Sequence, residues 1–172
     1  RTVWRLGVRA VALEPGQPGG FRITLSDGTR LEADGVVIAA PAASAAILLQ
    51  SLLAAESEWL RALPYASSAA VTLVYRDADL EPVARGRGFL VPARERRPIS
   101  AVTWVTNKFP ARAPEGFAVA RVFFRSNGNG LHDEEPPERL VALALHELRM
   151  LTGLRAQPLH AVVSRHYRAL PQ

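Results

Sequence analysis

Cysteine is absent from the 172-residue sequence, and lysine occurs once, as Lys108. A chain without cysteine forms neither disulfides nor thiolate metal sites, and its redox compartment is left open. The sequence opens at Arg1 without a basic-then-apolar leader. Apolar runs of the ~20 residues that a bilayer-spanning helix needs are also missing. These absences leave a globular protein, and 172 residues suit one domain or one domain with part of another.

Motifs for nucleophilic, metal-dependent and dinucleotide chemistry are missing as well. No serine lies in a G-x-S-x-G elbow, and no G-x-G-x-x-G follows a strand pattern. His146-Glu147 begins like H-E-x-x-H, but Met150 stands where the second histidine belongs. The spacings of the histidines fit no metal motif; they are His132, His146, His160 and His166. The sequence therefore predicts no catalytic residue and no metal site.

The positive charge is spread along the chain. The net charge is +5, and residues 94–97 (RERR) form the one tight basic cluster. Arginine forks onto carboxylate and phosphate groups, so an acidic ligand remains open. The scatter of the other arginines is more typical of a solvated face.

The first third of the chain predicts strands followed by a helix. Residues 3–15 alternate as in a strand, and residues 21–33 predict a hairpin around Asp27-Gly28. The apolar run at residues 36–38 predicts a short strand buried on both faces. Residues 41–63 are helical in composition, with Pro41 at the start and a bend or break near residues 54–57.

The rest of the chain is rich in strand patterns, with a boundary expected near residues 60–66. Residues 136–153 predict an amphipathic helix that starts at Pro137 and ends at Gly153. Together these elements predict an α+β fold with a mixed, largely antiparallel sheet and helices packed on one side. The expected strands are residues 68–76, 88–92, 99–108, 117–124 and 159–170.

Five stretches, taken in order, resemble one family of flavoenzymes. Residues 31–49 (LEADGVVIAAPAASAAILL) are similar to a strand and helix of flavin-dependent amine-oxidase-like proteins. The other four narrow the resemblance to the protoporphyrinogen/coproporphyrinogen oxidase family. They are YASSAAVTLVYR (65–76), GRGFLVP (86–92), AVTWVTNKFPARAPEGFAVARVFF (101–124) and RHYRALPQ (165–172).

The resemblance implies an internal fragment of a FAD-dependent oxidase that converts a porphyrinogen to a porphyrin in haem biosynthesis. Residues 1–60 would be a partial FAD-binding domain with the hairpin layer, return strand and helix. Residues 61–172 would be the substrate-binding domain. The Gly-rich segments that open and close such enzymes are missing from the sequence. We therefore expect FAD in the full-length parent, and neither bound FAD nor activity in the isolated fragment.

The resemblance also implies site residues. The backbone of Ala10, with Val11 beside it, corresponds to the segment that holds the adenine ring of FAD. Arg94, Arg96, Arg97 and Lys108 are candidates for the carboxylate arms of the substrate, although a solvated face explains them as well. The apolar wall of the substrate pocket corresponds to Leu90, Thr103, Trp104 and Phe123.

For three of these residues the resemblance leaves the role open. Thr103 departs from the aliphatic residue expected at its position. Trp104 and Phe123 are equally explained as core residues, because an alternating strand buries one face whatever it binds.

The expected partner is a porphyrinogen-type small molecule rather than a nucleic acid. A cytoplasmic location with peripheral contact to the cytoplasmic membrane, and a homodimer, are further expectations. One alternative is another enzyme of the flavin amine oxidase superfamily, such as an amine oxidase or a desaturase-like enzyme. A second alternative is a non-enzymatic module that binds an acidic partner through residues 94–97.

Overall fold

The computed structural model describes residues 2–125 and 135–171, so His132 lies outside the described residues. The chain divides into two compact units, Arg1–Pro64 (unit 1) and Tyr65–Gln172 (unit 2). That these units are a FAD-binding and a substrate-binding domain stays a prediction. No helix in the described ranges is long and apolar enough to cross a membrane.

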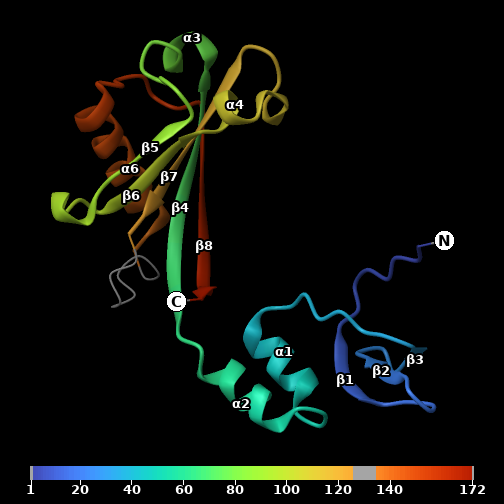
Figure 1. The fold of residues 1–172 in the computed structure, drawn as a ribbon. Helices are drawn as coiled ribbons and strands as arrows, with labels where there is room; N and C mark the ends of the chain where they lie inside the picture. Colours follow the sequence, from blue (N-terminus) through green and yellow to red (C-terminus); the bar gives the residue numbers. More distant parts are fainter. Residues whose placement is uncertain (1, 126–134, 172) are drawn as a thin grey trace. The chain divides into compact units, whose positions relative to one another are not determined.

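Unit 1 joins a three-stranded antiparallel sheet to two helices (Figure 1). The hairpin predicted around Asp27-Gly28 is confirmed: Gly28 has a φ of 83°, and the Thr29 N–H donates to Asp27 Oδ1 at 2.9 Å. In chain order, the elements of unit 1 are β1 (Ala10–Pro15), β2 (Phe21–Leu25), β3 (Arg30–Ala33), α1 (Ala42–Leu49) and α2 (Ala54–Ala62).

Side-chain hydrogen bonds hold the helices of unit 1 to each other and to the sheet. Ser57 is fully buried, and its Oγ donates to the Ala46 carbonyl at 2.8 Å. Ser51 Oγ donates to the Leu13 carbonyl of β1 at the same distance, 2.8 Å. These two bonds fix α1 beside β1, where a cavity described below is formed.

Three expectations for unit 1 need correction. Residues 36–38 form no strand, and Val37 is 93% exposed. A short apolar run is stable as a strand only where a neighbour pairs with it, and no described strand does so. The first strand is limited to Ala10–Pro15 for the same reason, since β2 ends its pairing opposite Ala10. The helix expected over residues 41–63 is interrupted at residues 50–53, slightly before the expected bend.

Unit 2 is built on a five-stranded sheet in the order β5-β6-β7-β4-β8, with every described pairing antiparallel. Its strands are β4 (Tyr65–Arg76), β5 (Gly88–Leu90), β6 (Ile99–Trp104), β7 (Phe117–Phe124) and β8 (His160–Pro171). Its helical segments are α3 (Asp77–Leu80), η1 (Ala93–Glu95), α4 (Val105–Lys108), η2 (Pro110–Arg112) and α6 (Pro137–Thr152).

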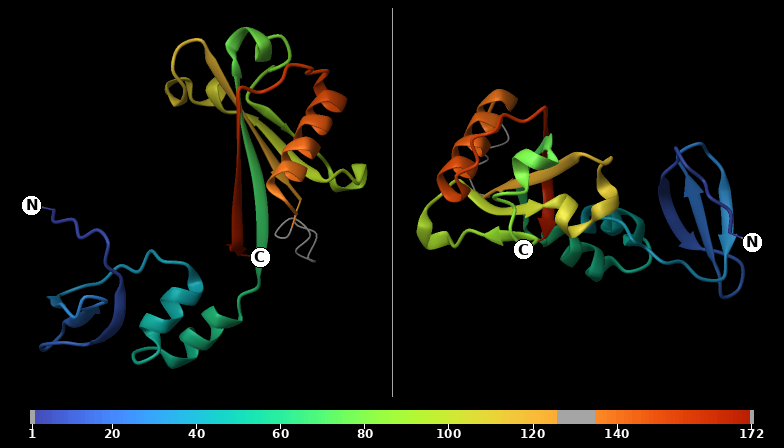
Figure 2. Two further views of the ribbon diagram at one scale, coloured as in Figure 1. Left: turned by 180° about the vertical axis from the view of Figure 1, so that it is seen from behind. Right: turned by 90° about the horizontal axis from the view of Figure 1, so that it is seen from above.

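Helix α6 covers one face of this sheet (Figure 2). It starts at Pro137 and ends at Gly153, which takes the left-handed conformation with a φ of 79°, as the sequence predicts. The side chains between α6 and the sheet are fully buried; they include Leu140, Ala144, Leu148, Leu73, Val102 and Val122. The expected α+β fold, with largely antiparallel sheets and helices on one side, is confirmed.

The strand expected over residues 99–108 ends earlier than the sequence predicts. Residues 105–108 form a helical turn, α4, because tertiary hydrogen bonds override their strand propensity. The Val119 N–H donates to Thr106 Oγ1 at 3.4 Å. Asn107 Nδ2 donates to the carbonyls of Ala84 at 2.7 Å and Gly86 at 3.1 Å.

Candidate cofactor and substrate sites

The predicted adenine-contact residues lie at a bulge in the edge strand of unit 1. Ala10 pairs with Leu25 and Ala12 pairs with Thr24, so Val11 is the additional residue between the two pairs. A bulged residue is left outside the regular ladder. The strand β1 is also an edge of its sheet, so its outer side faces no other strand of that sheet. Ala10 and Val11 thus lie where backbone groups can meet a ligand.

A cavity of about 520 Å³ lies beside this bulge, between β1 and α1. Both predicted residues line it. The remaining lining is mostly apolar and comes from Arg9, Ala40, Ser44, Ile47 and Leu48. A flat aromatic base needs apolar faces and a few polar groups at its edge, and this lining supplies both. The residues present therefore fit the adenine ring of a flavin dinucleotide.

The face of the unit 2 sheet that α6 leaves uncovered carries three of the four predicted substrate residues. Thr103 pairs with Gly88 and Arg121, and Phe123 pairs with Ala101, which in turn pairs with Leu90. Residues paired across antiparallel strands point to the same face. Leu90 is 82% exposed, while Thr103 and Phe123 are half-buried. The structure thus brings Leu90, Thr103 and Phe123 together on one surface.

Trp104 lies on the opposite face. It is 1% exposed, and its ring meets Phe89 edge-on at a centroid distance of 6.1 Å and an interplanar angle of 64°. Its neighbour Thr103 points the other way, because successive side chains of a strand alternate. The structure therefore places Trp104 in the core beneath α6 and not with the other three residues.

Arg121 is a candidate that the sequence reasoning missed. It lies between Thr72 and Thr103 on the uncovered face, and its Nε donates to Thr72 Oγ1 at 3.1 Å. The signal was present in residues 117–124, where Arg121 is the charged residue in an otherwise apolar strand. This geometry orients a guanidinium over a surface that also carries Phe123.

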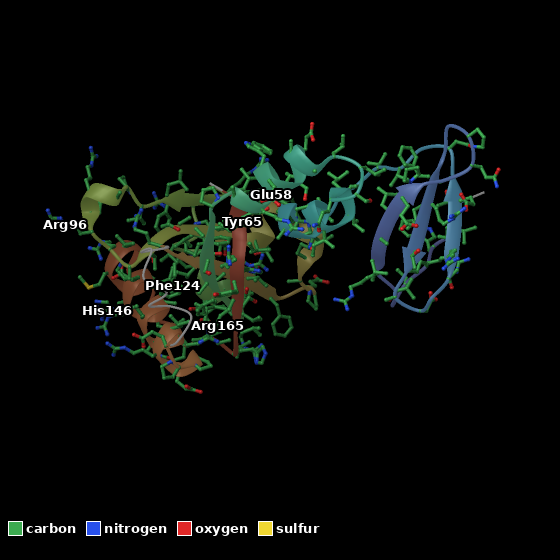
Figure 3. The ribbon with its side chains drawn as sticks, turned by 90° about the horizontal axis from the view of Figure 1, so that it is seen from below. Glu58, Tyr65, Arg96, Phe124, His146 and Arg165 are labelled. Carbon is green, nitrogen blue, oxygen red and sulfur yellow. The ribbon has the colours of Figure 1, made fainter. Side chains whose placement is uncertain are left out.

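The basic residues proposed for substrate carboxylates do not act as one set. Arg97 Nη1 pairs with Glu147 Oε2 of α6 at 3.1 Å, and the Glu147 side chain is 6% exposed. Arg94 is exposed and lies 3.8 Å from the Glu95 carboxylate. Arg96 lies at an exposed end of unit 2, whereas His146 lies on α6 (Figure 3). Lys108 is placed elsewhere, with its Nζ 5.4 Å from the centroid of the Phe109 ring.

Metal-ligating side chains do not gather in the described part of the chain. There, no group of three or more His, Cys, Asp or Glu side chains could hold a metal ion. The predicted site residues are gathered at two places, the cavity at the β1 bulge and the uncovered face of the unit 2 sheet.

Comparison with known proteins identifies the family of the chain as the flavin containing amine oxidoreductases. The model of that family matches residues 2–168, and the chain belongs to the family. The chain is 31% identical over 150 residues to coproporphyrinogen III oxidase of Propionibacterium freudenreichii subsp. freudenreichii, covering 87% of this chain and 28% of that protein. It is 30% identical over 182 residues to human protoporphyrinogen oxidase, covering 95% of this chain and 37% of that protein.

Solved structures share the fold. A crystal structure from Exiguobacterium sp. 255-15, provisionally described as a protoporphyrinogen oxidase, matches with a TM-score of 0.71 and 28% identity, over 97% of this chain and 36% of that one. A redesigned putrescine oxidase matches with a TM-score of 0.71 at 15% identity, over 91% of this chain and 34% of that one, which shows the fold alone. The chain thus spans about a third of the length of the relatives it matches.

Proposed function

We propose that this chain is part of a FAD-dependent enzyme that oxidises a porphyrinogen to a porphyrin in haem biosynthesis. The observation that carries the proposal is the uncovered face of the unit 2 sheet, where Leu90, Phe123 and Arg121 share one surface. Relatives named coproporphyrinogen III oxidase and protoporphyrinogen oxidase support the choice of substrate class.

Bound FAD would supply the redox chemistry of this reaction. In the proposal, unit 1 contributes only binding: the backbone at Ala10 and Val11 meets the edge of the adenine ring. Ile47 and Leu48 of α1 would cover a face of that ring. No catalytic side chain is assigned in this chain, because its proposed role is to hold the cofactor and substrate.

The uncovered sheet face suits a wide, flat ligand with acidic arms. Leu90 and Phe123 offer apolar area, and Arg121 can donate two parallel hydrogen bonds to a carboxylate. Thr72 orients the guanidinium through the 3.1 Å bond to its Nε. Leu90 and Phe123 would therefore contact the flat face of the macrocycle, and Arg121 would bind one of its carboxylate arms.

The proposed role of the uncovered sheet face is tested by binding of a carboxylate-bearing porphyrin to this chain. The shift of the porphyrin absorption band measures the binding. We expect Arg121→Ala to weaken binding about fivefold, the value of an exposed ion pair. Phe123→Ala should weaken it further through loss of apolar contact. Arg139→Ala is the matched control, since Arg139 is an exposed arginine of α6 on the other side of the sheet.

An equal effect of Arg139→Ala would show that binding is unspecific and would contradict the proposal. The amine-oxidase and desaturase-like alternatives are separated by oxidase assays of the intact parent enzyme. Turnover of amines but not of porphyrinogens would contradict the proposed substrate class and would leave the family assignment unchanged.

The proposal includes a cytoplasmic enzyme in peripheral contact with the membrane. Phe109 is 48% exposed, with Lys108 Nζ at 5.4 Å and Arg112 Cζ at 5.5 Å from its ring centroid. An exposed aromatic flanked by cations is suited to an anionic lipid surface. Phe109→Ser should reduce cosedimentation with phosphatidylglycerol vesicles, whereas Tyr167→Ser, a change at another exposed aromatic, should not.

A homodimer completes the proposed assembly. The exposed apolar side chains of unit 1, Leu53 and Val37 among them, support it because such area is costly in water. Sedimentation velocity of the chain at two concentrations tests it, and a monomer at both would contradict it.

A further inference from the structure

A second cavity of about 460 Å³ lies in unit 2, on the α6 side of the sheet. It is distinct from the uncovered face, because Trp104 and Phe89, which line it, point away from Thr103 and Leu90. Its volume falls within the usual range of small-molecule pockets, roughly 300 to 1,000 Å³. The residues that line it include Val83, Arg85, Gly88, Phe89, Trp104 and Leu151.

The floor of this cavity is aromatic and held in place. Phe89 meets Trp104 edge-on, at 6.1 Å between ring centroids, and Trp104 is 1% exposed. The backbone N–H of Trp104 donates to the Arg87 carbonyl at 3.1 Å, which fixes the loop before β5 against β6. Phe89 is only partly buried, so its ring is the one that a further apolar ring can pack against, while Trp104 lies directly beneath it.

The rim is preformed as well. Asn107 Nδ2 donates to the carbonyls of Ala84 and Gly86, so the loop that carries Arg85 is tied at both sides of that residue. Gly88 brings its backbone close to β6, where a Cβ would lie 2.2 Å from the Val102 carbonyl oxygen. Binding of a ligand in this cavity would therefore cost little conformational entropy, because the loop and strand that line it are already held in place.

One cation and no carboxylate line the cavity. Arg85 is exposed, and no ion pair joins it to another residue of the described chain. The hydroxyl of Thr152, also in the lining, already donates to the Leu148 carbonyl at 2.7 Å. The polar recognition available to a ligand is thus the guanidinium of Arg85 at the rim of an apolar floor.

We propose that this cavity is a binding site for a compact apolar ring that bears one carboxylate. The ring packs between Val83, Phe89 and Leu151, and the carboxylate accepts hydrogen bonds from Arg85. The site is independent of the cofactor and of the proposed oxidation, since it lies within unit 2 and on the face away from Phe123.

Fluorescence of Trp104 provides the test. Trp4 and Trp59 are the other tryptophans of the chain and are 81% and 65% exposed, so both can be changed to Phe to leave Trp104 as the reporter. The probes are para-tert-butylbenzoate and its neutral amide, para-tert-butylbenzamide. We expect the carboxylate to change Trp104 emission saturably and to bind more tightly than the amide.

Arg85→Ala should weaken carboxylate binding about fivefold and leave amide binding unchanged. Arg87→Ala is the matched control, because Arg87 is an exposed arginine two residues away that does not line the cavity. Leu151→Phe should fill the cavity and abolish binding of both probes, with circular dichroism as the check on folding. If Leu151→Phe does not fold, the comparison of Arg85→Ala with Arg87→Ala is the test of the proposed site.

Equal binding of carboxylate and amide, or equal effects of Arg85→Ala and Arg87→Ala, would overturn the assignment. An absence of any change in Trp104 emission would do the same. None of these results depends on flavin or porphyrin, so they leave the proposed oxidase function untouched.

Discussion

Tyr75 of β4 is buried in the core of unit 2, yet its hydroxyl finds no hydrogen-bond partner among the described residues. The ring contributes apolar area to the cluster beneath α6. The hydroxyl opposes folding, because a polar group removed from water without a partner loses its hydration. Burial also raises the pKa of Tyr75 from 10.0 to about 12.

Tyr75→Phe is therefore expected to stabilise the protein. The change keeps the ring and removes the unpartnered hydroxyl, which should raise the free energy of unfolding by about 1 kcal/mol. Urea denaturation at neutral pH measures it. Tyr167→Phe, at a tyrosine that is 73% exposed, should have no effect. A less stable Tyr75→Phe variant would mean that the hydroxyl has a partner.

The raised pKa of Tyr75 predicts a loss of stability in alkali. The folded protein holds the phenolic proton up to about pH 12, whereas the unfolded chain releases it near pH 10.0. Below pH 10.0 the phenol of Tyr75 is protonated in both the folded and the unfolded chain, so the free energy of unfolding is at its full value there. Between the two values the unfolded chain is the one that loses the proton, and stability falls as the pH rises. Urea midpoints across this window should fall more steeply for the wild type than for Tyr75→Phe.

At the scale of elements, the sequence correctly predicted turns and helix ends, because these depend on residues that are neighbours in the chain. Asp27-Gly28 defines a turn by its own backbone preferences, and Pro137 and Gly153 mark the ends of α6 in the same way. Residues 36–38 and 105–108 were predicted wrongly, because their conformation depends on residues distant in sequence. The first lacks a pairing strand, and the second is held by bonds from Asn107 to the 84–86 loop.

The candidate site was predictable only in part for a related reason. A period of two separates Thr103 from Trp104, but it does not say which of the two faces a helix will cover. The stripe of α6 that includes Leu140 and Leu148 makes that choice by burying the Trp104 face. Arg121 could be located only once the register placed it beside Thr72.

The loop between β5 and β6 is tied to α6 by a partly buried ion pair. Arg97 Nη1 lies 3.1 Å from Glu147 Oε2, with side-chain exposures of 30% and 6%. Arg97→Ala would leave the Glu147 carboxylate buried without its partner. We expect a loss of about 3 kcal/mol in the free energy of unfolding, measured by urea denaturation.

The double variant Arg97→Met with Glu147→Leu provides the comparison. It removes both charges and keeps apolar volume, so its stability should lie close to that of the wild type. A double variant as unstable as Arg97→Ala would show that the pair stabilises the fold by more than the cost of burying its charges.

Gly88 at the start of β5 allows a close approach that no other residue permits. Its φ is 138°, and an added Cβ would lie 2.2 Å from the Val102 carbonyl oxygen. Gly88→Ala should cost more than about 2 kcal/mol, from backbone strain and the clash together. Gly116→Ala separates the two, since Gly116 also has a positive φ, of 80°, but open space around it. If thermal melts show the same loss of stability for Gly88→Ala and Gly116→Ala, the steric clash at Gly88 does not contribute.

At the scale of the whole molecule, the two units differ in how much core they bury. Unit 2 buries one cluster that includes Trp104, Tyr75 and several leucines. Unit 1 buries few large side chains; its buried residues are Leu13, Leu25, Ala45, Ala46 and Ser57. Because burial of apolar surface is the dominant stabilising term, the units should differ in stability.

Urea denaturation should therefore show two transitions, with unit 1 unfolding first. Trp104 is 1% exposed and reports on unit 2 in a variant that keeps it as the one tryptophan, while far-UV circular dichroism follows the unfolding of both units. Emission from Trp104 should shift to the red only in the second transition. Coincident transitions for the two reporters would contradict the expectation.

The exposed run at residues 36–38 has a consequence in solution. Val37 is 93% exposed and Val36 is 36% exposed, and both belong to a stretch with no paired neighbour in the described chain. An exposed apolar segment with no paired neighbour is prone to associate with apolar segments of other molecules. Residues 36–38 are thus a place where this chain would associate with other exposed apolar segments at high concentration, and a charged residue at position 37 would oppose that association.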